Sequence, residues 1–555
     1  MTRATYTEIS HRLVDTTAKP EAEYSMDDLL EHSSFEEIKD EDEDPDSIMS
    51  SERNHNILDG SMTLVPDDPT TLDWGVWTNS KTDENADFDV DPVLSAEFEN
   101  VHTSTGITFV FEGDAYPEQI EIIWYNDSTV VASETFAPDA MTYFCDLTVE
   151  SYNKVVMTFS GMSLPDRHLK IAEIDYGEIK IWSKNGIISA NILEEINLTS
   201  TELTINTLEF SVHDDNEEFN MLNPDGVYVA LQEKQKLTVK EYLNGAAIKM
   251  GKFYLDTWEN TSTTVAAFTA YDAMGLFDTI QYITSPMWSD EPAENVFEHI
   301  FAAAGWTDYV IEDAIKTETV RGYIPAGSVR NALHHICLSL RCSCIPNRKG
   351  SVEIKRLPSE ADAIEIEKSR KLGSPKITQN ALVNSVAVTG YDFTVSTEST
   401  QLYSAELEAG SYEITFSNPA TNLSASGATI VDSGINYAKI SVTSSGTVAI
   451  TGNKYDSQSS IYTYEADGVT AANRAQKTVK DVYLVNGSNA EALAQFLYED
   501  YQRRIVQKFS MALEDEIAGD NVDVDTMLNA RKIGVITSLD IDLTGGFVAD
   551  MEVRG

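Results

Sequence analysis

Short runs of alternating apolar and polar residues recur along most of this chain, and they constrain its fold more than any other feature. Examples are "GITFVFEG" (106–113), "KVVMTFSG" (154–161) and "KIGVITSLDIDL" (532–543). Successive side chains of a strand point to opposite faces, so alternation indicates a strand with one buried face. Gly, Asn, Asp and Pro separate the runs, as in turns between antiparallel strands. The sequence predicts a mainly β protein with α+β parts.

Changes of pattern divide the 555 residues into several domains, as expected for a chain of this length. Residues 21–47 are dominated by acids, which favours a solvated, mobile linker over a docking tail. The predicted segments are an N-terminal arm and acidic linker (1–54), a jelly-roll β-sandwich (55–182), a barrel-like β domain (183–280), an α+β domain (281–396), an inserted small β-sandwich (397–466) and a C-terminal domain of a helix and a β-hairpin (467–555).

Two helices are predicted in the α+β domain. In "SDEPAENVFEHIFAAAGW" (289–306), Ser289 is the expected N-cap and Gly305 the expected C-cap. In "GSVRNALHHICLSL" (327–340), apolar residues recur at spacings of four, three and four. The two predicted apolar stripes are Val296, Phe297, Ile300 and Phe301, and Val329, Leu333, Ile336 and Leu340.

The C-terminal domain is predicted to contain one helix and a final hairpin. The helix is expected over 489–508, with a capping box between Ser488 and Glu491. In the hairpin, apolar residues alternate on both strands, which predicts one buried face. These residues are Leu539, Ile541 and Leu543, and then Phe547, Ala549, Met551 and Val553.

The net charge of −52 limits the partners of the chain. So strong a negative charge repels phosphate backbones and anionic lipids, which argues against nucleic acid or a membrane surface as the target. No apolar run approaches the ~18 residues of a membrane span, so membrane insertion is not expected. The start lacks the apolar core of a secretory signal, and four cysteines do not make a disulfide framework, so folding in a reducing compartment is expected.

"LHHICLSLRCSC" (333–344) concentrates histidine and cysteine and is the first place to look for chemistry. On a helix, His334 and His335 diverge by about 100°, whereas a zinc pair needs histidines four residues apart. Cys342 and Cys344 alternate with polar residues on a strand and are expected on one side of it. Core packing is therefore favoured over a metal site or a nucleophile.

No catalytic or nucleotide-binding motif is found in the sequence. Acidic clusters such as "HDDNEE" (213–218) and "GDNVDVD" (519–525) offer calcium ligands, but none has the register of an EF-hand loop. In a chain with 91 acids, solvated turns are the favoured interpretation. No cofactor is expected, and no calcium site is assignable.

Aromatic residues in the first β-sandwich suggest carbohydrate binding, since flat rings stack on sugars. Trp77 is expected in the core, as strand tryptophans usually are. Trp124 and Tyr125 are adjacent on a strand, so one of them should face outward. Trp74 lies in a loop rich in Pro and Asp and is the residue most expected to be exposed. The predicted glycan-binding residues are Trp74, Trp124 and Tyr125.

Several segments resemble tail proteins of phages and prophages that infect Gram-positive bacteria. "LDGSMTLVPDDPTTLDWGVWTNS" (58–80) and the strands after it resemble a galactose-binding-like jelly roll found in such proteins. "LEFSVHDDNEEFNMLNPDG" (208–226), "KMGKFYLDTWE" (249–259), "AYDAMGLFD" (270–278) and the final 37 residues, 519–555, resemble tail hub proteins, often described as prophage tail endopeptidases. The resemblance covers most of 50–555, with the 397–466 island as an interruption.

The resemblance implies a structural virion protein made in the bacterial cytoplasm. Such hubs form a homotrimeric ring at the tail tip or baseplate, close the tail tube, and open for genome ejection. Expected partners are the distal tail protein ring, the tape measure protein and tail fibres or receptor-binding proteins, with DNA only in transit and a host cell-wall glycan on the accessory modules. An acidic channel wall would repel DNA and prevent sticking.

Two other functions remain open from the sequence. One is a tail-borne, wall-degrading peptidase or glycosidase; the other is a stand-alone carbohydrate-binding protein. The first is disfavoured because the chain stops at the expected last hairpin of the hub, with no C-terminal peptidase domain. The second is disfavoured because no export signal is found. The sequence therefore predicts a protein that is not an enzyme.

Overall fold

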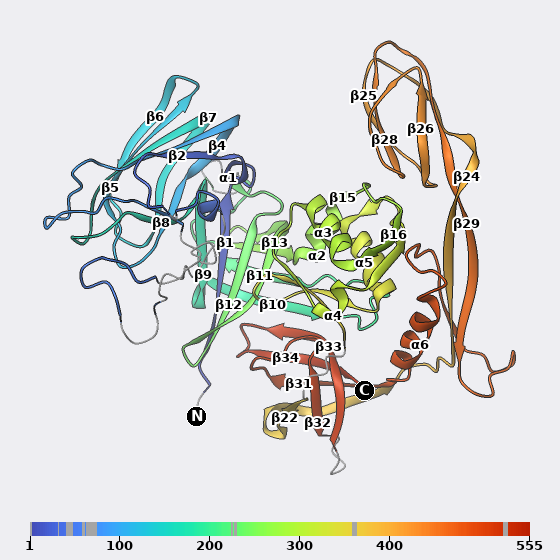
Figure 1. Cartoon of the computed structure of the whole chain (residues 1–555). Helices are drawn as coiled ribbons and strands as arrows, with labels where there is room; N and C mark the ends of the chain where they lie inside the picture. Colours follow the sequence, from blue (N-terminus) through green and yellow to red (C-terminus); the bar gives the residue numbers. More distant parts are fainter. Residues whose placement is uncertain are drawn as a thin grey trace.

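Strands dominate the structure, a computed structural model that describes residues 3–31, 33–39, 48–57, 62, 75–223, 226, 230–357, 363–525 and 531–555. Figure 1 shows a β-sandwich on one side, a large sheet at the centre, a helical body above it and a long arm on the other side. The mainly β, multidomain fold predicted from the alternating runs is confirmed.

The central element is a 13-stranded sheet with strands from both ends and the middle of the chain. Its main path runs β23-β31-β34-β33-β10-β11-β14-β13-β12-β1-β9, and β32 and β22 continue from β33. The strands are β1 (Thr5–Val14), β9 (Gly177–Ser183), β10 (Ile187–Glu195), β11 (Thr207–His213), β12 (Lys236–Leu243), β13 (Ala246–Ser262), β14 (Val265–Tyr271), β22 (Ile364–Ile366), β23 (Lys371–Gln379), β31 (Ile505–Ala512), β32 (Asn521–Asp525), β33 (Arg531–Asp542) and β34 (Val548–Arg554).

This sheet is open, and the segments predicted as barrel-like domains contribute their strands to it. Strands β23 and β9 end its main path, and no pairing between them occurs in the described parts of the chain. β10 pairs with β33, so the segments 183–280 and 467–555 contribute to one sheet. One apolar core lies against both halves, from Ile9 to Val553. The predicted alternation of the last hairpin is confirmed, because all seven of its inward residues are buried.

The N-terminal segment is part of the fold. β1 pairs with β12 on one side and β9 on the other. β2 (Glu23–Met26) pairs with β4 (Val93–Phe111) of the sandwich, and Ile38 is fully buried in the sandwich core. The prediction of a solvated, mobile linker is therefore wrong for the described part of 21–47, because β2 pairs with β4, Ile38 lies in the sandwich core, and Glu21 and Asp28 accept hydrogen bonds from Asn100 and Ser80. Residues 40–47 lie outside the described residues.

The segment predicted as a β-sandwich, called the sandwich below, contains one seven-stranded antiparallel sheet around one apolar core. Its path is β3-β8-β4-β7-β5-β6, with β2 added beside β4. Register shifts interrupt the pairing of the long strands β4 and β7 between Glu97 and Gly106, where the strands change direction. The remaining strands are β3 (Val76–Trp77), β5 (Pro117–Asn126), β6 (Thr129–Phe136), β7 (Thr142–Met162) and β8 (Lys170–Asp175).

The α+β body contains α2 (Ala273–Thr279), α3 (Ala293–Ala304), α4 (Asp313–Lys316) and α5 (Val329–Leu340). The two predicted apolar stripes are confirmed as buried, and Gly305 ends α3 with φ 63°. Ser289 is not the N-cap, because β16 continues to Pro292 by pairing with β18. Short strands surround the helices: β15 (Gln281–Tyr282), β16 (Trp288–Pro292), β17 (Tyr309–Ile311), β18 (Thr319–Gly322), β19 (Gly327–Ser328), β20 (Ser343–Pro346) and β21 (Val352–Lys355).

The arm projects from the body on two long paired strands, β24 (Ser385–Leu407) and β29 (Gly446–Glu465) (Figure 1). At its tip two small sheets enclose a core of their own. At its base α6 (Ala490–Tyr501) packs against both long strands. The other strands of this part are β25 (Gly410–Thr415), β26 (Ala420–Ser426), β27 (Thr429–Ser433), β28 (Tyr437–Val442) and β30 (Gln476–Val479).

Helix α6 is shorter than the predicted helix over 489–508. It ends at Tyr501 because the chain enters β31 at Ile505. The predicted capping box does not form: Ser488 donates its hydroxyl to Asn486 Oδ1, and Asn489 precedes the first turn. The sequence predicted the apolar stripe of this helix, but it did not predict the residue at which the following strand ends the helix.

His11 lies on the core side of β1, fully buried between Trp182 and Phe268, with ring centroids 5.6 and 5.8 Å away. Burial lowers the pKa of His11 from 6.5 to about 3. Between these pH values the folded chain keeps the ring neutral while the unfolded chain protonates it. Stability therefore rises with pH through this window and falls on acidification.

We expect the buried, neutral His11 to lower the free energy of unfolding by roughly 2 kcal/mol when the pH falls from 7 to 5. The substitution His11→Phe removes this titration, so urea unfolding of the central sheet should depend less on pH in this variant. His213→Phe is the control, because His213 is exposed at the end of β11. Equal pH dependence of the His11→Phe variant and the wild type would contradict the assignment.

Candidate functional site

The predicted glycan-binding residues do not form one exposed aromatic surface. Trp124 is fully buried in the sandwich core, so its ring offers no face to a ligand in this fold. Tyr125, the next residue on β5, is half-buried on the other side of the strand. Trp74 lies outside the described residues. Trp77 is buried as expected: its Nε1 donates to Glu112 Oε2 at 2.7 Å.

The histidine and cysteine stretch lies in the core of the α+β body. Cys337, Cys342 and Cys344 are all buried, which confirms the predicted packing role. Burial raises the pKa of the Cys337 thiol well above its usual range, so the thiol stays protonated and is a poor nucleophile. Burial also lowers the pKa of His335 to about 3. His334 contacts the carbonyl of Ser200 through Nδ1 at 2.9 Å.

These side chains do not assemble a metal site. Within the described ranges, no group of three or more His, Cys, Asp or Glu residues is placed to hold a metal ion. The ring planes of His334 and His335 are 76° apart, with 5.6 Å between the ring centroids. None of the helices in the described residues is both long and apolar enough to cross a membrane.

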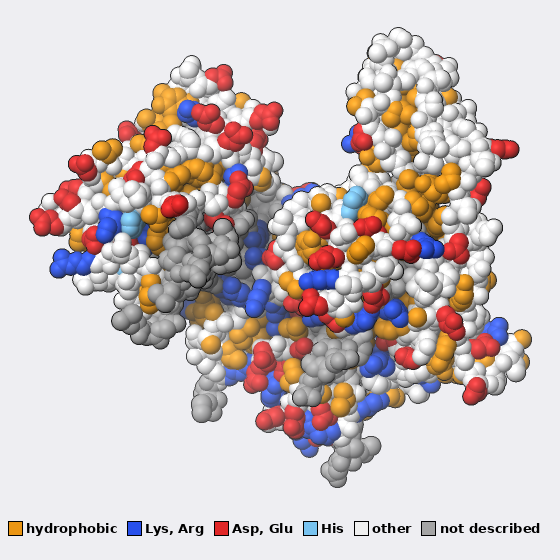
Figure 2. All heavy atoms as spheres, in the orientation of Figure 1, with side chains coloured by type: hydrophobic (Ala, Val, Ile, Leu, Met, Phe, Trp, Pro, Cys, Tyr) orange, Lys and Arg blue, Asp and Glu red, His pale blue; other side chains and the backbone are white. Residues whose placement is uncertain are grey.

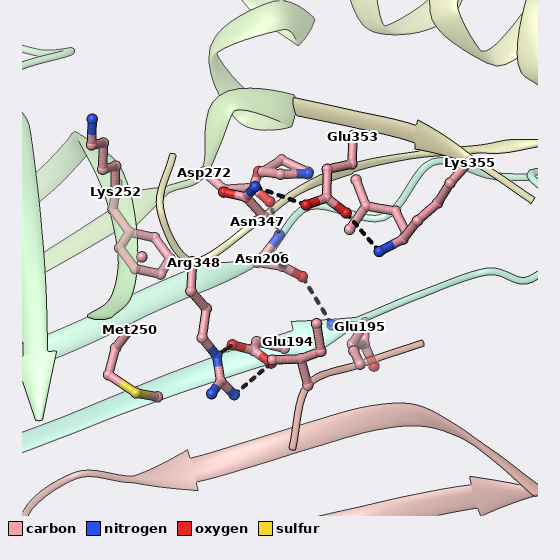
Figure 3. Close-up of a pocket in the computed structure, with 16 residues that line it drawn as sticks. Glu194, Glu195, Asn206, Met250, Lys252, Asp272, Asn347, Arg348, Glu353 and Lys355 are labelled. Carbon is pink, nitrogen blue, oxygen red and sulfur yellow. Dashed lines mark hydrogen bonds and ion pairs between the residues drawn. The ribbon is translucent and has the colours of Figure 1, made fainter. Parts of the chain in front are cut away.

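A small cavity lies where the central sheet, the α+β body and the C-terminal strands meet (Figure 3). β10 and β13 line one side, the β20–β21 hairpin another, and Ile517 and Ala518 a third. Its volume of about 40 Å³ holds a few water molecules and no small-molecule ligand. The cavity is therefore part of a joint between domains.

Arg348 is the central side chain of this joint. Its Nε and Nη2 donate to Oε1 and Oε2 of Glu194 at 2.6 and 3.0 Å, a bidentate pair. Its Nη2 also donates to the carbonyl of Glu516 at 2.9 Å. Arg370 binds the carboxylate of Glu516 at 2.6 Å and the carbonyl of Ala512. One hairpin of the α+β body is thus tied to β10 and to the C-terminal strands.

The other polar groups of the joint also have partners. Glu353 accepts from Asn347 Nδ2 at 2.9 Å and from Lys355 Nζ at 2.6 Å. Asp272 accepts from the backbone N–H of Asn206 and caps α2 through that of Met274. Figure 3 shows that carboxylates lining the joint pair with side chains of the joint itself.

A second buried ion cluster joins the N-terminal segment to the sandwich. Arg12 on β1 binds Glu173 on β8 at 2.7 Å and contacts Asp175, and Lys19 binds Asp175 at 2.9 Å and contacts Glu173. Burial and the neighbouring Asp175 raise the pKa of Glu173 to about 7. The two cations and two carboxylates balance, as buried charges must.

The arm is held at its base by aromatic contacts. Tyr323 stacks on Tyr483 with 5.0 Å between ring centroids, and Phe393 of β24 packs edge-on against Tyr323 at 5.2 Å. Farther along the arm, Asn436, a buried residue directly before β28, donates to the carbonyl of Ile324 at 2.9 Å. These contacts set the direction of the arm relative to the body. No sequence pattern predicted them, because the partners lie 70 to 160 positions apart.

No protein-family model and no curated protein sequence matches this chain. Among solved structures, it is similar to prophage tail protein gp18 from Listeria monocytogenes EGD-e (11% identity, TM-score 0.39), over 68% of this chain and 91% of that one. It is also similar to the 43 kDa tail protein of prophage MuSo2 from Shewanella oneidensis (8% identity, TM-score 0.39), over 67% of this chain and 95% of that one. A third similar structure is a tail protein from Neisseria meningitidis MC58 (10% identity, TM-score 0.39), over 68% of this chain and 94% of that one. Similarity at this level does not carry function, so the role of the chain is argued from its own residues.

We expect Arg348→Met to destabilise the joint by about 3 kcal/mol, because Glu194 would remain as a buried, unpaired carboxylate. Hydrogen exchange of the β10 and β33 amides measures this loss locally. Arg321→Met is the control, since Arg321 and its partner Asp290 are both more than half exposed and such pairs contribute about 0–1 kcal/mol. Adding Glu194→Gln to Arg348→Met should recover part of the loss. Equal exchange in the two arginine variants would contradict this role of Arg348.

Proposed function

We propose that this chain is a structural protein of a phage tail tip or baseplate hub. The observation that carries the proposal is the open 13-stranded sheet, which gathers the first strand, the middle strands and the last strands of the chain into one platform. A sandwich, an α+β body and an arm are attached to it through buried ion pairs and aromatic contacts. This construction suits a rigid connecting part of a larger assembly.

Two further observations support a structural role over a catalytic one. Side chains of the joint and of the α+β core whose pKa values are strongly shifted are buried, and they take part in packing or in ion pairs. The joint cavity is too small for a peptide or sugar. The sequence resemblance to tail hubs over most of 50–555 adds the tail tip as the place of assembly. The alternatives, a wall-degrading enzyme and a stand-alone carbohydrate-binding protein, gain no support from these contacts.

In the proposed role the chain is a virion component and assembles as a homotrimeric ring. The ring would close the tail tube, join the distal tail protein ring to the fibres or receptor-binding proteins, and open for the tape measure protein and the genome. The charge of −52 would help such a ring to pass DNA without binding it.

Sizing chromatography with light scattering on the purified full chain tests this proposal. The expected mass is three times 61.4 kDa, and electron micrographs should show a ring. Cell-wall suspensions should keep their turbidity when the protein is added. A monomer that clears the walls would instead support the enzyme and would exclude the structural ring.

We also propose that this part of the chain binds a glycan through Tyr125 and through Trp74, which lies outside the described residues, and not through the buried Trp124. Substituting either residue by Ala should reduce binding to a host cell-wall polysaccharide, because each ring would contribute stacking area. A glycan array with the wild type, each variant and Phe136→Ala, a half-buried residue of β6, measures this. No signal from the wild type, or unchanged binding by both variants, would count against the surface.

A further inference from the structure

Four charged side chains are buried together where the N-terminal segment covers the sandwich. Figure 2 shows acidic side chains spread over the visible surface of the sandwich, in contact with solvent. In contrast, none of the four side chains of this cluster is more than 8% exposed. They are Arg12, Lys19, Glu173 and Asp175. The cluster therefore lies in a dry interior, where neutral groups are favoured over charged ones.

The acids come from a strand and the amine from a short helix. Glu173 and Asp175 stand two positions apart on β8, so their side chains point to the same face of the strand. Ile174, between them, belongs to the sandwich core. The chain that follows β1 covers the outer face of β8 and carries Lys19 on α1 (Ala18–Glu21). In Figure 1, α1 lies at the end of β1, beside the sandwich.

A second set of polar contacts fixes the position of α1. The ring nitrogens of His102, a buried residue of β4, contact Asp15 Oδ2 at 2.8 Å and Glu21 Oε2 at 3.2 Å. Asn100 Nδ2 donates to Glu21 Oε2 at 3.1 Å. These contacts lie on both sides of Lys19 in the sequence, so the lysine is held against β8.

Arg12 gives the two carboxyl groups different environments. Its Nη1 and Nη2 bind Oε1 and Oε2 of Glu173 at 2.7 and 3.0 Å, so both oxygens of Glu173 are held. At Asp175 the guanidinium contacts Oδ2, while Lys19 Nζ lies 2.9 Å from Oδ1. Lys19 Nζ also contacts Glu173 Oε1. One amine thus touches two carboxyl groups, and one of the two Asp175 oxygens lies beside a cation that does not lose its proton.

We propose that Lys19 and Asp175 condense to an isopeptide bond, which joins the N-terminal segment covalently to the sandwich. A bond forms between Nζ of Lys19 and Cγ of Asp175, the bond between Cγ and Oδ1 breaks, and one water leaves. The reaction consumes no oxidant, cofactor or second molecule. The inference goes beyond the function proposed above and does not depend on the ring.

Each neighbour has a defined part in this reaction. Proton transfer from Lys19 to Asp175 gives the neutral amine and the neutral acid, the forms that a dry interior favours. As Nζ attacks, negative charge grows on Oδ2, where the Arg12 guanidinium lies. Glu173 takes the proton from Nζ and passes it to Oδ1, which leaves as water. Burial and the charge of Asp175 raise the pKa of Glu173 to about 7, so this carboxyl can take up and release a proton near neutral pH.

The product keeps the interior electrically balanced. Before the reaction two cations face two carboxylates. Afterwards the pair of Arg12 and Glu173 remains, and the new amide is neutral, so no buried charge is left without a partner. The bond links residues 156 positions apart and crosses the contact between the N-terminal segment and the sandwich. It would hold this contact under a mechanical load that separates ion pairs.

Intact-mass spectrometry of the purified full chain under denaturing conditions tests the bond. The wild type should be lighter than its sequence by one water after incubation at neutral pH. Lys19→Arg keeps the charge but has no amine to condense, and Glu173→Gln removes the proton carrier, so both variants should keep their full sequence masses. Tandem mass spectrometry of a digest of the wild type should identify a branched peptide that joins Lys19 to Asp175.

Lys170→Arg is the matched control. Lys170 and Glu52 form another buried pair of a lysine and a carboxylate beside the sandwich, at 2.5 Å. This variant should still be lighter by one water. Circular dichroism shows whether each variant is folded. If Lys19→Arg or Glu173→Gln does not fold, the presence or absence of the branched peptide in the wild type decides.

Three results would overturn the bond. They are a wild type at its full sequence mass, a water loss that persists in Lys19→Arg, and a branched peptide at Glu173. A water loss within an Asp–Gly step, such as Asp467–Gly468, belongs to the second result, because it indicates a cyclised aspartate. The native mass of the assembly is measured separately, so the ring and the bond can fail independently.

Discussion

Two strands of the central sheet, β1 and β10, determine through their neighbours how the rest of the molecule is arranged. β1 lies between β12 and β9, and β10 lies between β11 and β33. Backbone N–H and C=O groups inside a sheet have to be paired, so each of these strands needs both neighbours. β1 thereby attaches β9, the strand that follows the sandwich, to the central sheet, and β10 attaches the C-terminal strands. The sandwich and the C-terminal hairpin take their positions from these two ladders.

Buried ion pairs complete the attachments that the ladders begin. Arg12 and Lys19 hold the sandwich through Glu173 and Asp175, and Arg348 holds the α+β body through Glu194. Removing charges from water is costly unless their partners meet in one geometry. A joint of this kind therefore allows fewer relative positions than apolar packing of the same area. Rigid joints are what a connecting part of an assembly requires if a force at one end is to reach the other.

Local sequence patterns predicted the strands and helices of this fold, but they did not predict which strands pair with each other. Alternation identified the strands of the last hairpin, and helical spacing identified the buried face of α5, because both depend on neighbours in sequence. Ser289 failed as a cap because β16 pairs with β18, about 30 positions later. The pairing of β10 with β33 joins residues almost 350 positions apart, and no single-sequence pattern encodes it.

In the candidate site, too, the sequence predicted only what depends on local spacing. Burial of Cys337, Cys342 and Cys344 followed from their spacing, since helix and strand periodicity place them on apolar faces. Arg348 carried no signal, because an arginine in a turn is usually solvated and its partner Glu194 is 154 positions away. Between Trp124 and Tyr125, alternation indicated that one faces outward, and only the packed core shows that it is Tyr125.

Several of the cationic residues of this strongly acidic chain lie at the joints between its parts. Arg12, Lys19, Arg348 and Arg370 balance carboxylates at the joints, so they add little positive charge to the surface. Two copies that approach with acidic surfaces facing each other repel, which costs free energy. A chain of this charge can therefore select one mode of contact with its own copies mainly by repelling the others, which is how specificity arises from unfavourable alternatives.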